Sequence, residues 1–334
     1  MTSLPATLSL DLDDKWAYVR THGDPRWQEY PTYLPEVAPR IVDFLAARDL
    51  RLTAFVVGCD AERATAQPAL NLLVSAGHEI GNHSMNHYPW LRSLPEDEIV
   101  HEVVEAELAI ENATGVRCRG FRAPGFSGSP SVHQVLASRG YDYDASSFPT
   151  FLGPLARIYC RLTASLWRGD DDPRRSLFGG WRDGMAPLKP HLLGAGADAI
   201  VEIPVTTAPI LRAPFHMTYL LFLRQKAGSA WRSYLRLALA LCAARGVAPS
   251  MLLHPLDFLG CEDEPDLAFF PGMKLPRAAK LAVVDETLDR IGARHRIATL
   301  GDAAEQVRRS AGLVRAEDLA EEPAIAAAAA ASGR

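Results

Sequence analysis

Two histidines lie four residues apart in the segment His83-Ser-Met-Asn-His87. On a helical turn, side chains at this spacing project from one face, so both imidazoles could bind the same metal ion. Histidines also occur at this spacing by chance, and a surface or capping role is the alternative. The preceding residues 77–82 predict a short strand and a tight turn, which would bring the pair to a strand end. This position favours a two-histidine metal site.

A run of carboxylates, Asp11, Asp13 and Asp14, ends an apolar segment that predicts a strand. Like charges this close repel one another unless a cation or an arginine offsets them, so a metal ion is a natural partner. A solvated turn or a helix N-cap is the alternative. Together with the histidines, one carboxylate would complete a two-histidine, one-carboxylate site with open positions for water and a substrate carbonyl.

Two further polar side chains follow apolar segments. Arg122 stands before the turn that Pro124 and Gly125 predict, where a guanidinium could hold a second carboxylate in its ionised form. His254 ends an apolar segment, a position suited to protonating a leaving amine. A structural arginine and a buried, hydrogen-bonded core histidine are the alternatives.

Apolar segments that predict buried strands alternate with segments of helical periodicity. This order predicts a mainly parallel sheet covered by helices, either a barrel or an open doubly wound sheet, with active residues at the carboxyl ends of its strands. The candidate site residues follow four different predicted strands. The predicted strands are Thr7–Leu12, Leu52–Val57, Glu79–Ile80, Gly120–Phe121, Ile200–Ile203, Ser250–Leu253 and Ile297–Leu300. The predicted helices are Glu36–Arg48, Gln67–Ala76, Pro95–Thr114, Ser131–Ser138, Ser229–Arg245 and Pro276–Ile291, and Gly77, Gly115, Gly140 and Gly246 are predicted C-caps.

Composition limits the class of protein. The 334 residues are 48% hydrophobic and 22% charged, as in an ordinary globular chain, and the net charge of -5 gives no general attraction to nucleic acid or an anionic membrane. We expect one α/β domain over residues 1–312, with an insertion at about 149–199 and an alanine-rich, partly disordered tail at 313–334. Five widely separated cysteines predict reduced thiols. Without a recognisable secretion signal or membrane-spanning segment, the expected location is the cytoplasm.

Five motifs in order resemble those of the NodB-homology polysaccharide deacetylases, over about Ala6 to Thr299. They are Asp11-Leu-Asp13-Asp14, His83-Ser-Met-Asn-His87, Arg122-Ala-Pro124-Gly125, Tyr143-Asp144-Ala-Ser-Ser and Leu-Leu-His254-Pro. The resemblance implies a distorted (β/α) barrel. It also implies metal-dependent hydrolysis of an N-acetyl or related acyl group, usually on an amino sugar.

The resemblance also implies roles for individual residues. Asp14, His83 and His87 would bind one divalent metal ion, most often Zn²⁺. Asp13 would be the general base, Arg122 would steady Asp13, His254 would be the general acid and Asp144 would support His254. Pro124 and Gly125 would contact the substrate. A third carboxylate at Asp11 and Lys15 in place of a glycine depart from the usual pattern, so Asp11 is the alternative base or a supporting group.

The expected substrate is an acylated amino sugar, carrying an acetyl or formyl group, in a polysaccharide or linked to a lipid. Segments 151–168 and 217–245 mix aromatic, aliphatic and basic residues with almost no acid, so peripheral contact with the inner face of a membrane is one interpretation. Packing of both segments on the barrel is the alternative. A hydrolase of a small non-sugar amide and a degenerate saccharide-binding protein are the competing functions. Nucleic-acid binding is not expected.

Overall fold

A curled, mainly parallel sheet forms the centre of the computed structural model, which describes residues 4–153 and 181–312. Its strand order is β10-β1-β2-β3-β4-β5-β7-β6, with β11 also paired to β1, and every pair is parallel except β6–β7. The strands are β1 (Ala6–Leu12), β2 (Thr53–Val56), β3 (Glu79–Asn82), β4 (Gly120–Phe121), β5 (Tyr143–Asp144), β6 (His191–Leu193), β7 (Ile200–Glu202), β10 (Ser250–Leu253) and β11 (Ile297–Ala298). A separate hairpin joins β8 (Thr207–Ala208) to β9 (Ala213–Pro214).

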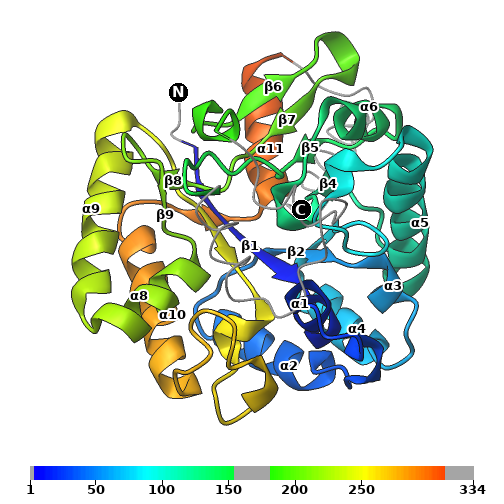
Figure 1. The fold of residues 1–334 in the computed structure, drawn as a ribbon. Coiled ribbons are helices and arrows are strands. Elements are labelled where there is room, and N and C mark those ends of the chain that lie inside the picture. The colour runs from blue at the N-terminus through cyan, green and yellow to red at the C-terminus, as the bar shows by residue number, and fades with distance from the viewer. Residues whose placement is uncertain (1–3, 154–180, 313–334) are drawn as a thin grey trace, which may run out of the picture.

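Helices surround this sheet (Figure 1). They are α1 (Lys15–His22), α2 (Leu34–Ala46), α3 (Gly58–Ala61), α4 (Gln67–Ser75), α5 (Glu96–Thr114), α6 (Pro130–Ser138), α8 (Met217–Ala227), α9 (Ala230–Arg245), α10 (Arg277–Gly292) and α11 (Leu300–Ser310). The chain after β7 comes back to β10, where the Thr206 backbone nitrogen donates to the Ser250 carbonyl (3.1 Å) and Thr206 Oγ1 accepts from the Ser250 nitrogen (2.7 Å). These hydrogen bonds join the segment after β7 to β10 without a continuous β-ladder. The predicted distorted (β/α) barrel is confirmed.

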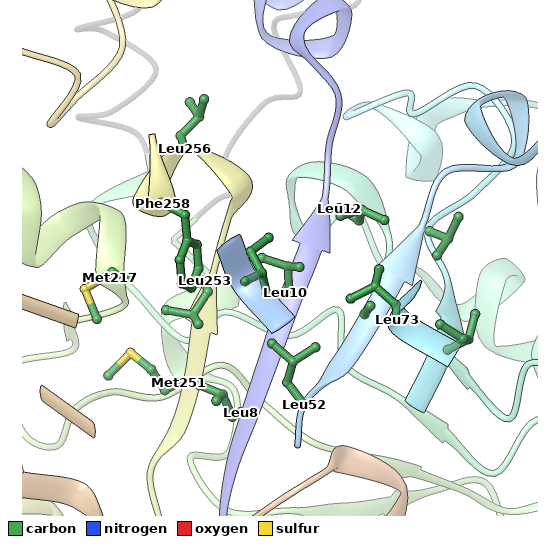
Figure 2. Close-up of a cluster of buried hydrophobic side chains, with 14 of the residues drawn as sticks. Leu8, Leu10, Leu12, Leu52, Leu73, Met217, Met251, Leu253, Leu256 and Phe258 are labelled. Carbon is green, nitrogen blue, oxygen red and sulfur yellow. The ribbon is translucent and has the colours of Figure 1, made fainter. Parts of the chain in front are cut away.

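Successive side chains of β1 alternate between the two faces of the sheet. Leu8, Leu10 and Leu12 are at most 1% exposed and pack among apolar side chains of the neighbouring strands and helices (Figure 2). The intervening residues Ser9 and Asp11 point to the other side, because successive side chains of a strand alternate. A second cluster of buried apolar side chains lies on the same side as Ser9 and Asp11. It includes Phe55, Tyr143, Val201, Leu300 and Ala304. One strand therefore supplies both core contacts and polar side chains.

The predicted elements agree with the structure to within a few residues, and the four predicted glycine C-caps all have positive φ. Three longer helices were missed: α1, α8 and α11. Within the predicted insertion, His191–Leu193 forms β6 at one edge of the sheet, whereas residues 154–180 lie outside the described part, as does the predicted tail. Cys59, Cys118, Cys242 and Cys261 are free thiols, as expected. Among the helices that the structure describes, none is long and apolar enough to cross a membrane.

Leu10→Ala should lower the free energy of unfolding by about 2–5 kcal/mol, because it leaves a cavity in the core beneath the polar face of β1. The control is Leu108→Ala on α5, where the leucine is 45% exposed and the expected change is within about 0.5 kcal/mol. Both values can be measured by urea denaturation. Equal effects of the two substitutions would contradict the assignment of Leu10 to the core.

Candidate active site

Three polar side chains converge at the carboxyl ends of β1 and β3. Asp13 Oδ1 lies 3.1 Å from His87 Nε2 and 3.4 Å from His83 Nε2, and all three residues are buried. Apart from these two imidazole nitrogens, Oδ1 of Asp13 has no polar partner among the described residues. Two ligands of a tetrahedral zinc ion, each about 2.0–2.1 Å from the metal, are about 3.3 Å apart. The chemistry and spacing of these donors therefore fit a divalent metal ion.

The carboxylate beside the histidines is Asp13, whereas the sequence-based ligand set contained Asp14. Asp11 and Asp13 share one face because side chains two residues apart along a strand point the same way. Asp14 points elsewhere and caps α1: its Oδ1 accepts hydrogen bonds from the backbone nitrogens of Lys15 (2.7 Å) and Tyr33 (3.2 Å). The structure thus corrects the predicted position of Asp14 and gives it the N-cap role that was its alternative.

The two histidines lie on a loop rather than on the helical turn that their spacing suggested. Ser84 and His87 both have positive φ, 63° and 50°. The loop is fixed to α5, because the Met85 nitrogen donates to the Glu102 carbonyl and the Asn86 nitrogen donates to the Glu102 carboxylate. Left-handed backbone at a non-glycine residue costs free energy and persists only where neighbouring contacts hold it.

Arg20 supplies contacts of this kind from α1. Its guanidinium donates to the backbone carbonyls of Asn86 (2.9 Å) and His87. The same guanidinium lies over the rings of Trp16 and Tyr88, 4.8 and 5.3 Å from their centroids. Arg20 therefore binds the backbone carbonyl of His87, while the imidazole of the same residue faces Asp13.

Arg122 is fully buried and orients both a histidine and a carboxylate of the site. Its carbonyl lies 2.6 Å from His83 Nδ1, which leaves Nε2 free to face Asp13. Its guanidinium donates to Asp11 Oδ1 (2.7 Å), Ser9 Oγ (2.8 Å) and the Ala145 carbonyl (3.0 Å). The carboxylate that Arg122 steadies is thus Asp11, the alternative base, and the predicted Arg122–Asp13 pair is wrong.

His254 follows β10 at the same edge of the sheet. Leu253 pairs with Leu10, so His254 comes level with Asp11 on the neighbouring strand. The Nδ1 atom of His254 lies 3.2 Å from Thr218 Oγ1, and its backbone nitrogen donates to Asp257 Oδ2 (2.7 Å). Thr218 belongs to α8, which sequence reasoning missed, so no signal in the motifs pointed to it.

His216 is a second imidazole near this position, also missed from the sequence. Burial lowers the pKa of His216 to about 3, the charge of His254 acts in the same direction, and Asp11 opposes them. The ring lies against Phe148 and Tyr219, with centroids 5.3 and 6.4 Å away. A neutral imidazole therefore borders the site beside α8.

Asp144 belongs to a different cluster from the one predicted for it. Its carboxylate lies 3.0 Å from His133 Nε2 and accepts from Ser146 Oγ, and it is hydrogen-bonded to Glu202. Burial and the adjacent charge of Asp144 raise the pKa of Glu202 well above its usual range. Among the described residues, the expected contact between Asp144 and His254 is not found. The His254 ring contacts Thr218 instead.

Pro124 and Gly125 form a short 3-10 turn after β4, with Gly125 at φ 59°. A Cβ atom on Gly125 would lie 2.8 Å from Cβ of Pro89. The turn therefore packs closely on the loop that follows the two histidines. Substrate contact by these two residues stays a prediction.

The chain is similar to known proteins in sequence and in fold. Residues 9–143 match the family model for polysaccharide deacetylases. The first part of the chain is thus similar to polysaccharide deacetylases. Over 108 residues it is 33% identical to a chitooligosaccharide deacetylase of Sinorhizobium fredii, covering 32% of this chain and 48% of that protein. Over 89 residues it is 29% identical to a peptidoglycan-N-acetylglucosamine deacetylase of Bacillus cereus, covering 27% and 31%. The matches thus span less than half of these relatives.

Two solved structures share the fold of this chain. One is a Mycobacterium smegmatis protein provisionally assigned as a polysaccharide deacetylase, with a TM-score of 0.56, 19% identity and 93% coverage of both chains. The other is an allantoinase, with a TM-score of 0.56, 18% identity and coverage of 91% of this chain and 89% of the other. At these identities the likeness concerns the fold alone.

A further buried carboxylate, Asp60, lies near Asp14. Asp60, on α3, accepts a hydrogen bond from Trp16 Nε1 (2.8 Å) and lies 3.2 Å from Arg63. Burial raises the pKa of Asp60 to about 7, helped by the charge of Asp14, although the Trp16 hydrogen bond and Arg63 oppose the shift. Asp60 is therefore partly protonated near neutral pH.

Asp60→Asn should change how the stability of the protein depends on pH. As the pH rises from 5 to 8, the unfolded chain has already lost this proton while the folded protein must release it, so the wild type loses about 2–3 kcal/mol through Asp60. The variant lacks this loss and should gain that amount relative to wild type over the same range. Urea denaturation at fixed metal content measures the difference, and parallel profiles for the two proteins would refute it.

Proposed function

We propose that this protein is a metal-dependent hydrolase that removes the N-acetyl group from an N-acetylglucosamine-containing saccharide. The observation that carries the proposal is the joint arrangement of Asp13, His83 and His87 with Asp11 held by Arg122. The matched stretches of relatives described as deacetylases of chitooligosaccharide and peptidoglycan support the substrate class. Asp13, His83 and His87 would bind the ion, with zinc as the best fit to two imidazoles and one carboxylate.

The chemistry divides between the metal ion and the residues around it. A divalent ion bound at this cluster would polarise the acyl carbonyl and make the attacking water more acidic. Asp11 takes the proton from that water, because its carboxylate is held in place by the Arg122 guanidinium 2.7 Å away. Arg122 itself has no exposed surface, so it stays fixed while the charge on Asp11 changes.

His254 completes the reaction from the neighbouring strand. Water adds to the acyl carbon, the C–N bond breaks, and the nitrogen takes a proton from His254 as it leaves. The products are acetate and the free amino sugar. His254 suits this role because it stands level with Asp11 and its exposure is intermediate, so substrate can reach it.

A lipid-linked substrate and membrane contact stay predictions. In segment 217–245, α8 buries Met217, Leu220 and Leu221, and α9 buries Trp231 and Leu235 within the protein. Both helices thus use their apolar stripe for packing, which favours the alternative given for this segment. Most of segment 151–168 lies outside the described residues.

Matched carboxylate variants test the proposal. Asp13→Asn and His83→Ala should each lose bound metal and activity, whereas Asp11→Asn should keep about one metal per chain and lose about 10²–10⁴-fold in kcat. Asp14→Asn is the control, because an asparagine still caps α1 and should leave metal content unchanged. The measurements are metal content of the purified proteins and acetate release from chitooligosaccharides, with and without chelator.

Several results would contradict this assignment. Loss of metal in Asp14→Asn but not in Asp13→Asn would reverse the ligand assignment. Chelator-resistant acetate release would remove the metal from the mechanism. Release only from small non-sugar amides would retain the hydrolase and reject the saccharide.

A further inference from the structure

The beginning of α8 contacts the ring of His254. Thr218 is the second residue of α8, its side chain is buried, and its Oγ1 lies 3.2 Å from His254 Nδ1. Helix α8 packs beside β10, the strand that ends at His254. A helix outside the recognised motifs therefore supplies a polar contact to this imidazole.

The other polar neighbours of His254 are engaged differently. Asp257 accepts a hydrogen bond from the His254 backbone nitrogen (2.7 Å), so its Oδ2 is directed at the main chain. Asp11 is held by Arg122, and the neutral His216 adds no positive charge. Among the side-chain to side-chain hydrogen bonds of the described residues, Thr218 is the partner of the His254 ring; the backbone nitrogen of Asp257 also faces this side chain in the capping box after β10.

A hydroxyl group differs from a carboxylate as a partner for an acid histidine. Threonine Oγ1 accepts a hydrogen bond from Nδ1–H and thereby fixes the ring orientation. It carries no negative charge, so it does not stabilise the imidazolium as strongly as an aspartate would. The Nε2 proton of such an imidazolium is easier to give away.

We propose that Thr218 is a positioning residue for His254: it holds Nδ1–H so that Nε2–H faces the leaving nitrogen. This inference rests on the proposed function. During C–N cleavage the nitrogen takes the bond's electron pair and the proton from Nε2. His254 becomes neutral with Nδ1–H still bound to Thr218, and solvent later returns a proton to Nε2. The ring therefore keeps one orientation through the cycle.

Leaving-group dependence separates this role from simple packing. An N-acetylated chitooligosaccharide needs a proton on its leaving nitrogen, whereas 4-nitrophenyl acetate has a leaving group stable as an anion. Thr218→Val keeps the side-chain shape and removes the hydroxyl. It should lower kcat on the amide about ten- to hundredfold, the value of one hydrogen bond to a charged group, and leave ester turnover within about twofold.

Two further variants control this experiment. Thr218→Ser restores the hydroxyl and should recover most of the amide activity. Thr287→Val makes the same change at a buried threonine on α10 whose Oγ1 has no hydrogen-bond partner, and should change neither activity. In a His254→Ala background, Thr218→Val should cause no additional loss, because its effect acts through the imidazole.

The results distinguish this inference from the proposed function. Wild-type protein that binds metal but releases no acetate from chitooligosaccharides refutes the proposed function. An active wild type in which Thr218→Val lowers amide and ester turnover equally, or lowers neither, refutes the role of Thr218. An added loss in the His254→Ala background also refutes it. Amide-selective loss, recovery with serine and no added loss in that background support it.

Discussion

The fully buried guanidinium of Arg122 is the interaction on which the site depends. It connects Ser9 and Asp11 of β1 with the Ala145 carbonyl beyond β5, and its own carbonyl orients His83. Burying a charge is costly unless it is paired and hydrogen-bonded, and Asp11 provides the pair. The orientation of both the proposed base and a proposed metal ligand therefore follows from satisfying one buried cation.

The sequence predicted much of the fold because apolar periodicity is a local property. It also indicated Asp11, Asp13, His83, His87, Arg122 and His254, because each lies at or just after the end of a strand of a parallel sheet. It missed Thr218 and His216. It failed on the choice between Asp13 and Asp14, although the alternation of β1 contained the answer: Ser9, Asp11 and Asp13 share a face, opposite Leu8, Leu10 and Leu12. The motif pattern favoured Asp14, whereas the alternation of side chains along β1 favours Asp13.

Other parts of the site could not be read from local pattern. Thr218 and His254 are 36 residues apart, and their contact depends on how α8 packs beside β10. The partners of Asp144 are likewise set by the curvature that brings β5, β7 and α6 together. The loop of His83 and His87 has positive φ at two non-glycine residues, which spacing alone cannot indicate. Each of these features arises from tertiary contacts.

The bracing of His87 by Arg20 affects the free energy with which the proposed metal ion would bind. The unfavourable backbone conformation at His87 is already stabilised by Arg20, the Trp16 and Tyr88 rings and the anchoring of the loop to α5. Metal binding therefore does not have to supply the free energy for ordering this ligand. A zinc finger folds only with its ion, whereas the contacts of Arg20, Trp16, Tyr88 and Glu102 hold this loop without one, so we expect metal loss and unfolding to be separable events.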